Sequence, residues 1–387
     1  MTTVADVYDV VIGVDTHLRT HTLARAGTGR AGGYLTVANS PTGWGQALAF
    51  VTAMPDGGTS GDRVVVAMEG TRSHGAQLAR FLVAAGVLVV EIERPRRRHA
   101  RQRGKSDLLD ARAAARAVLD YDADRLPTPR ADGAREALRI LLGARDLLVH
   151  EATATWNALL ALLATGDPAD LQWRRELTRS RQRTLRALAI RPAPAAEPVD
   201  DRVRREQAAA YAARLLALAG ETRRNERALR DLLNTCAPAL LDLPGVGPVT
   251  AARATVAWSH PGRCHDADAF ARLAGAAPLE ASTGEGTGPE RGPVRHRLSR
   301  GGDRRLNSAL HMIILTRARN HEPTRAYIAR RTREGKTRRE IRRCLKTYLA
   351  RQLYRTLTAC WQDTTTPLAP TPASRRGAPA VSSSSPA

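Results

Sequence analysis

Short apolar segments alternate with helical patterns over the first third of the chain, and their order restricts the possible folds more than any other feature. In chain order the patterns predict strands over residues 8–14, 20–26 and 34–37, a helix over 41–53, a strand over 63–68, a helix over 76–85, a strand over 87–92 and a helix over 107–119. The first and fourth strands are apolar almost throughout, as is typical of strands buried on both faces of a sheet. An α/β domain is therefore expected.

Two of these strands end in an acidic residue: Asp15 follows the first and Glu69 follows the fourth. Three strands and then alternating helices and strands are the order of a ribonuclease H-like domain, in which the first and fourth strands are neighbours. Because ligands of open α/β sheets gather beyond the carboxyl ends of the strands, both acids are expected at one binding site. A single acid at a strand end is more often a turn residue, but two acids in this order favour a site.

Two further carboxylates, Asp107 and Asp110, stand three residues apart at the start of the last helix. Residues i and i+3 share a helix face, so both could point at one ion. Together with Asp15 and Glu69 they suit Mg²⁺, which takes carboxylate, water and phosphate oxygens. The structural alternative is an acidic first turn with Asp107 as N-cap and Asp110 at N3. The two roles are compatible, since a capping carboxylate can also bind an ion.

The chain is strongly basic, with 60 Lys and Arg against 38 Asp and Glu and a formal net charge of +22. This imbalance predicts a polyanionic partner, most often nucleic acid. The densest basic segment precedes the Asp107 helix and is expected to hold the phosphate backbone through Arg96, Arg97, Arg98, Arg101, Arg103 and Lys105. Actin-like sugar kinases and ATPases also begin with a strand that ends in Gly-x-Asp. However, the second half of this chain contains no repeat of the first domain, and so high a positive net charge does not suit a small-molecule kinase.

The cysteines and the apolar segments indicate the compartment. The four cysteines form no C-x-x-C pair and show no zinc spacing. The N-terminus lacks a signal pattern, and no segment approaches the roughly 18 consecutive apolar residues of a membrane span. We therefore expect a cytoplasmic, nucleoid-associated protein with reduced thiols and no membrane partner.

Helical periodicity dominates the middle of the chain, over residues 132–163 and again over 202–234. A break at 166–168 and a proline-rich segment at 191–199 separate the two stretches. This pattern predicts two long helices in an antiparallel hairpin or coiled coil. Such a pair is either a structural spacer or, through its apolar stripe, a dimer contact.

The C-terminal third carries two signals of nucleic-acid binding. Residues 241–252 resemble a helix-hairpin-helix motif, in which Gly245 and Gly247 allow a tight turn and free amides can hold a phosphate. An ordinary helix–turn–helix corner is the alternative. The basic helices that close the domain supply further candidates for phosphate contact, namely Arg297, Arg300, Arg304 and Arg305.

Ser282 lies in a glycine-rich loop with arginines close behind it in the sequence. Its hydroxyl could attack a scissile phosphate while guanidinium groups stabilise the charge of the transition state. By residue type and context alone, a serine in such a loop is far more often a polar turn residue.

Six motifs in chain order together resemble one known family. They are Val-Ile-Gly-Val-Asp15, Ala-Met-Glu69-Gly, Lys-Ser-Asp107-Leu-Leu-Asp110-Ala, Leu-Pro-Gly-Val-Gly-Pro at 243–248, Ala-Pro-Leu-Glu-Ala-Ser282-Thr-Gly, and the basic run from His296 to Asn307. The pattern is similar to that of DEDD transposases of the insertion-sequence 110 family, a group related to the Piv DNA invertases, and it covers residues 8–357.

The resemblance implies that Asp15, Glu69, Asp107 and Asp110 bind the metal ion and that Ser282 is the nucleophile. Family members assemble as dimers and tetramers in which the acids of one subunit meet the serine of another. At least some use a structured bridge RNA that pairs with donor and target DNA. The stretch 285–293 is longer and more acidic than the family pattern, which keeps Ser299 as an alternative nucleophile.

The expected architecture is α/β plus α. It comprises a ribonuclease H-like (RuvC-like) DEDD catalytic domain over 1–125, a helical or coiled-coil connector over 130–236, a mostly helical C-terminal transposase domain over 237–362 and a disordered tail over 363–387. The expected function is Mg²⁺-dependent DNA cleavage, strand exchange and rejoining through a phosphoserine intermediate, guided by a bridge RNA. The alternatives are a Mg²⁺-dependent Holliday-junction endonuclease without serine chemistry and a catalytically inactive nucleic-acid-binding protein.

Overall fold

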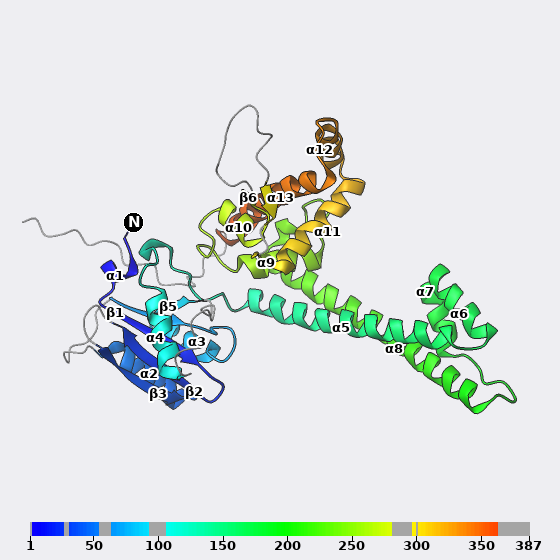
Figure 1. Ribbon diagram of the computed structural model, residues 1–387, viewed down its shortest axis with the longest axis horizontal. Coiled ribbons are helices and arrows are strands. Elements are labelled where there is room, and N and C mark those ends of the chain that lie inside the picture. Colours follow the sequence, from blue (N-terminus) through cyan, green and yellow to red (C-terminus); the bar gives the residue numbers. More distant parts are fainter. Residues whose placement is uncertain are drawn as a thin grey trace, which may run out of the picture. The chain divides into compact units, whose positions relative to one another are not determined.

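The computed structural model describes residues 2–26, 31–53, 63–92, 106–280, 296–298 and 301–362. The chain divides into two compact units, Met1–Ala131 and Asp132–Thr364 (Figure 1). The boundary follows residues 126–132, which form neither helix nor strand, and Gly133 has a positive φ of 63°. Prolines at 127 and 129 explain why neither a helix nor a sheet ladder continues through this segment.

A five-stranded sheet in the order β3-β2-β1-β4-β5 forms the centre of the N-terminal unit. Its strands are β1 Val10–Thr16, β2 Thr20–Ala26, β3 Ala31–Ala38, β4 Val64–Met68 and β5 Leu88–Glu91. The pairs β1–β2 and β2–β3 are antiparallel, whereas β1–β4 and β4–β5 are parallel. The expectation that the first and fourth strands are neighbours is confirmed.

The helices of this unit are α1 Val4–Val7, α2 Pro41–Thr52, α3 Ala76–Ala84, α4 Asp107–Ala117 and the 3-10 turn η1 Ala123–Arg125. Successive residues of a strand point to opposite faces of the sheet. Val10, Ile12 and Val14 of β1 accordingly pack in the core with α2 and α3. Val11 packs on the other face, in the core that contains α4. The same alternation assigns Asp15, at the end of β1, to the α4 face.

Two long antiparallel helices, α5 and α8, begin the second unit (Figure 1). Its first helices are α5 Ala134–Ala164, α6 Pro168–Arg179, α7 Arg181–Ala189 and α8 Val199–Cys236. The long pair lies close to the two ranges expected from periodicity, whereas α6 and α7 were not expected. Leu177 and Leu188 of these short helices join Leu159 and Leu215 of the long pair in one core, and this packing accounts for their position.

The remaining elements of the second unit are η2 Pro238–Leu240, α9 Pro248–Trp258, α10 Ala267–Leu273, β6 Pro278–Glu280, β7 His296–Leu298, α11 Arg304–Asn320, α12 Glu322–Arg333 and α13 Arg338–Gln362. Leu138 of α5 and Leu229 of α8 share a core with Trp258, Phe270 and Leu353. The long helices and the C-terminal helices thus belong to one compact unit with a continuous core.

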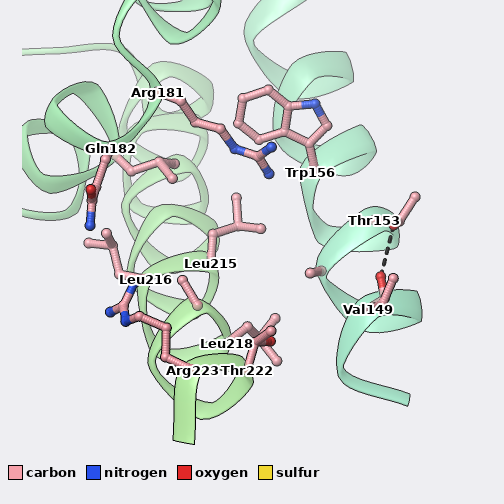
Figure 2. Close-up of a pocket in the computed structure, with 13 residues that line it drawn as sticks. Val149, Thr153, Trp156, Arg181, Gln182, Leu215, Leu216, Leu218, Thr222 and Arg223 are labelled. Carbon is pink, nitrogen blue, oxygen red and sulfur yellow. Dashed lines mark hydrogen bonds between the residues drawn. The ribbon is translucent and has the colours of Figure 1, made fainter. Parts of the chain in front are cut away.

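A pocket of about 500 Å³ opens between α5, α7 and α8. Figure 2 shows Trp156 on one side and Leu215, Leu216 and Leu218 on the other. The Arg181 guanidinium lies 3.8 Å from the centre of the Trp156 ring, a cation–π contact that joins α7 to α5.

Among the described helices, α5 is long and apolar enough to cross a membrane by length and composition alone. The expectation from the sequence concerned an unbroken run of about 18 apolar residues, and α5 contains no such run. The apolar residues of α5 are interrupted by polar ones, so a search for an unbroken apolar run overlooks the helix. In the structure α5 packs along α8, and Glu151 accepts a hydrogen bond from Nε of Arg214 at 2.6 Å.

Candidate metal-binding site

The close approach of α4 to β1 depends on Gly13. A Cβ atom at this position would lie 1.9 Å from the carbonyl oxygen of Ala111 and 2.4 Å from the amide nitrogen of Ala115. Both atoms belong to the α4 backbone and cannot rotate away as a side chain could. A glycine is therefore required for α4 to lie against the strand, two residues before Asp15.

The first turn of α4 carries the expected pair of carboxylates, but the helix begins one residue earlier than the capping alternative assumed. Ser106 is the N-cap, with an extended backbone (φ −144°, ψ 133°), and Asp107 is the first helical residue. The expectation that Asp107 is the N-cap is wrong, because the backbone of Ser106 is the last one outside the helix. Asp107 and Asp110 still lie in the first turn, where the positive end of the helix dipole favours carboxylates.

Asp15, His17 and Asp107 converge at the end of β1. Nε2 of His17 lies 3.1 Å from Oδ2 of Asp15 and 3.3 Å from Oδ1 of Asp107. One ligand atom from each residue lies within 4.8 Å of the other two, and together they form a group that could hold a metal ion. The sequence interpretation did not include His17, although its position two residues after a candidate ligand was a signal available for finding it.

Asp15 is the least exposed member of this group. Its side chain is 12% exposed, compared with 41% for His17 and 49% for Asp107. Burial raises the pKa of Asp15; the charge of His17 opposes this effect, and the nearby carboxylates of Asp110 and Asp107 raise the pKa further. A divalent cation bound here would favour the ionised carboxylate and so oppose the effects of burial and of the other carboxylates.

Glu69 follows β4 beside the same strand end. The parallel register pairs Val14 with Met68, so the next positions along the two strands are Asp15 and Glu69. The hydroxyl of Thr16 donates to the carbonyl oxygen of Glu69 at 3.1 Å and ties the two strand ends together. Among the described residues, the group of three converging ligand atoms includes neither Glu69 nor Asp110, although Asp110 is close enough to raise the pKa of Asp15.

A second histidine lies behind this site. His21 of β2 pairs in register with Thr16 of β1 and is fully buried. Neither of its ring nitrogens has a hydrogen-bond partner. Burial lowers the pKa of His21; the side chain of Asn39 opposes this effect, and the charges of His17 and His74 reinforce it. His21 is therefore harder to protonate than an exposed histidine.

The two glycines of the expected helix-hairpin-helix motif have different environments. Gly245 has φ +75°, and a Cβ there would meet Cγ of Arg317 at 3.1 Å and the carbonyl of Ile313 at 3.2 Å. Its role in this structure is to let the turn pack on α11. Gly247 is the N-cap of α9, and a Cβ there would meet nothing within 4 Å. The open space at Gly247 leaves room for a phosphate to approach, although its own amide donates to Thr250 Oγ1 at 3.0 Å.

Three of the arginines expected to bind phosphate, Arg297, Arg304 and Arg305, lie in the described part of the chain. Arg304 and Arg305 are the first residues of α11, are exposed, and follow the capping residue Asp303. Arg305 forms an ion pair with Asp146 at 2.9 Å. Arg297 lies in β7, which pairs with β6. The remaining expected residues lie outside the described part of the chain: Arg96, Arg97, Arg98, Arg101, Arg103, Lys105, Ser282, Ser299 and Arg300.

Two family models match the chain. The DEDD transposase model of the IS110 group, described as "Transposase", matches residues 12–168, which include the acids of both strand ends and of α4. A second model, described as "Transposase IS116/IS110/IS902 family", matches residues 237–329. A comparison with curated proteins finds no match.

Proposed function

The chain belongs to the IS110 family of DEDD transposases, and from this membership we propose that it moves an insertion sequence by metal-dependent cleavage, exchange and rejoining of DNA strands. The observation that carries the proposal is the convergence of Asp15, His17 and Asp107 at the end of β1, with their ligand atoms within 4.8 Å of one another. Such a donor set fits a divalent cation, which would oppose the burial and the neighbouring carboxylates that raise the pKa of Asp15.

The acids Asp15, Glu69, Asp107 and Asp110 hold Mg²⁺ in this proposal. When bound, the ion would neutralise charge on the phosphate and stabilise the attacking or the departing oxygen. The sheet order β3-β2-β1-β4-β5 supports a ribonuclease H-like (RuvC-like) domain, because it makes the Asp15 and Glu69 strands neighbours. Asp107 and Asp110 come from α4, which Gly13 allows to lie against β1.

Ser282 supplies the nucleophile, with Ser299 as the alternative. Its Oγ attacks the scissile phosphorus as the bond to the 3′ oxygen breaks; the hydroxyl proton passes to a base, and the departing 3′ oxygen takes up a proton from a general acid or from water and becomes a free 3′ hydroxyl. The 5′ side of the strand remains on the serine as a phosphoserine ester. A 3′ hydroxyl from the partner strand then attacks this ester and releases the serine. Each step exchanges one ester bond for another, so rejoining requires no ATP.

Nucleic-acid contacts are the second part of the proposal. The net charge of +22 supports binding of donor and target DNA and of a structured guide RNA. Phosphate contacts are assigned to Arg96, Arg97, Arg98, Arg101, Arg103, Lys105, Gly245, Gly247, Arg297, Arg300, Arg304 and Arg305. The functional unit is a homo-oligomer, a dimer or tetramer, in which the acids of one subunit meet the serine of another.

The test is the recovery of a covalent protein–DNA adduct from cells that carry the element with its flanking DNA. After nuclease digestion, mass spectrometry should find a nucleotide on Ser282. Ser282→Ala should abolish the adduct and retain DNA binding, whereas Ser299→Ala, the matched control, should retain both. Asp107→Asn should abolish adduct formation and cleavage together.

Three results would contradict parts of this proposal. An undiminished adduct in Ser282→Ala would transfer the nucleophile to another residue. Cleavage without any adduct, with free 5′-phosphates as products, would identify a Holliday-junction endonuclease. Full activity of Asp107→Asn would remove the metal site from the mechanism. Sequencing the RNA that co-purifies with the protein tests the guide separately, because its pairing segments would match donor and target DNA.

A further inference from the structure

The imidazole of His17 lies between two of the acids that the proposed function assigns to the metal. Its Nε2 is 3.1 Å from Oδ2 of Asp15 and 3.3 Å from Oδ1 of Asp107. The backbone holds the residue in this place, because the His17 amide donates to the carbonyl of Thr20 at 3.0 Å and closes the turn between β1 and β2. The hairpin therefore fixes the backbone position from which the ring reaches the two carboxylates.

These separations match those of ligands around one ion. Oxygen and nitrogen ligands lie about 2.1 Å from Mg²⁺, Mn²⁺ or Zn²⁺, so two neighbouring ligands are about 3.0 Å apart in an octahedron and about 3.4 Å apart in a tetrahedron. The two distances from Nε2 fall between these values. His17 and Asp107 are also partly exposed, which leaves room for water or phosphate oxygens in the remaining positions.

We propose that His17 is itself a ligand of the ion, through Nε2, together with Asp15 and Asp107, and that it directs the site toward ions that accept nitrogen. Imidazole binds transition-metal ions, including Mn²⁺ at the weak end of their affinity order, more readily than it binds Mg²⁺, which prefers a set of oxygen ligands. The inference rests on the proposed metal dependence of the acids and adds a residue outside the four DEDD positions. It predicts that the full-length protein prefers Mn²⁺ over Mg²⁺ more strongly than an all-oxygen site would.

The alternative is that His17 only donates a hydrogen bond to the two carboxylates and screens their repulsion. The two roles have opposite consequences for metal binding. A ligand strengthens the binding of the ion, so its removal weakens affinity. A hydrogen-bonding imidazole competes with the ion for the same carboxylate oxygens, so its removal leaves affinity unchanged or increases it.

The experiment measures Mn²⁺ binding to the full-length protein by electron paramagnetic resonance, without DNA and without any assay of activity. A titration gives the affinity, and electron spin-echo modulation detects a ¹⁴N nucleus bonded to the ion. We expect ¹⁴N modulation in the unsubstituted protein and its loss in His17→Gln. The affinity of His17→Gln should fall by at least about 10-fold, because even residues that only support a metal ligand contribute about 10–100-fold.

His17→Asp and His265→Gln complete the set. His17→Asp replaces the nitrogen ligand by oxygen and should shift the preference back toward Mg²⁺, measured by displacement of Mn²⁺. His265 forms a histidine–carboxylate pair with Asp266 at the same 3.1 Å but lies in the second unit. His265→Gln should leave both the affinity and the ¹⁴N modulation unchanged, which shows that the signal does not come from any histidine–carboxylate pair.

The outcomes separate this inference from the proposed function. The role of His17 would be overturned, and the acid site kept, by three results together. The unsubstituted protein would show no ¹⁴N modulation, His17→Gln would bind Mn²⁺ undiminished, and Asp107→Asn would lose Mn²⁺ binding. If Asp107→Asn bound Mn²⁺ as tightly as the unsubstituted protein, both the role of His17 and the acid site would be overturned. Loss of ¹⁴N modulation together with weaker binding in His17→Gln would establish the histidine as a ligand.

Discussion

Gly13→Ala should separate the two halves of the candidate site without altering any of its ligands. The added Cβ would lie 1.9 Å from the carbonyl oxygen of Ala111, whereas ordinary contact begins at 3.4 Å. Opening the gap to that distance requires α4 to retreat from β1 by about 1.5 Å. Because Asp107 lies at the start of α4, the retreat moves its carboxylate away from Asp15 and His17.

The free-energy cost follows from the same geometry. Overpacking of a close-packed core costs about 1–3 kcal/mol, and the smaller entropy of the unfolded alanine chain offsets about 0.4–1 kcal/mol of this. We therefore expect the free energy of unfolding to fall by about 1–2 kcal/mol. Strand cleavage should fall much further, by about 10²-fold, since a displacement of 1 Å in a catalytic group has effects of this size.

Urea denaturation, Mn²⁺ titration and strand cleavage measured on the same preparation test this prediction. The matched control is Gly33→Ala, a substitution in β3 of the same sheet, where a Cβ would meet nothing within 4 Å. The control should change neither stability nor metal affinity appreciably. If Gly13→Ala matched the control in all three measurements, the close contact between α4 and β1 would not be what positions Asp107.

Two further predictions concern the second unit. Trp258 is 1% exposed and packs against Trp361 with ring centres 5.3 Å apart, so Trp258→Ala should lower the free energy of unfolding by about 3–5 kcal/mol in urea denaturation. Burial lowers the pKa of Lys346, and Arg342 lowers it further. The unfolded chain therefore holds this proton to higher pH than the folded chain, and stability should rise as the pH increases toward the ordinary lysine value. The rise should be smaller in Lys346→Met and unchanged in Lys336→Met, a surface control, when unfolding is measured across that pH range.

The order of strands and the acids at their ends could be read from the sequence. Apolar runs such as 8–14 and 63–68 mark buried strands, because every residue in them must avoid water on both faces of the sheet. The alternation of side chains along a strand then fixes which face Asp15 occupies. The two long helices were equally predictable, since their leucines recur at helical spacing. The short helices α6 and α7 were not, because few of their residues are apolar and their leucines are buried in a core that α5 and α8 complete.

The sequence by itself determined that Asp15, Glu69, Asp107 and Asp110 are candidates for one site, because these residue types follow strands and begin a helix in a fixed order. Only the tertiary structure decided which side chains meet. His17 joins Asp15 and Asp107 because a hairpin turn fixes its backbone at the end of β1 and because α4 lies against β1 at Gly13. The hairpin condition is local, since the His17 amide bonds to Thr20. The contact of α4 with β1 joins segments about 90 residues apart, and such a contact arises from packing in three dimensions rather than from local sequence pattern.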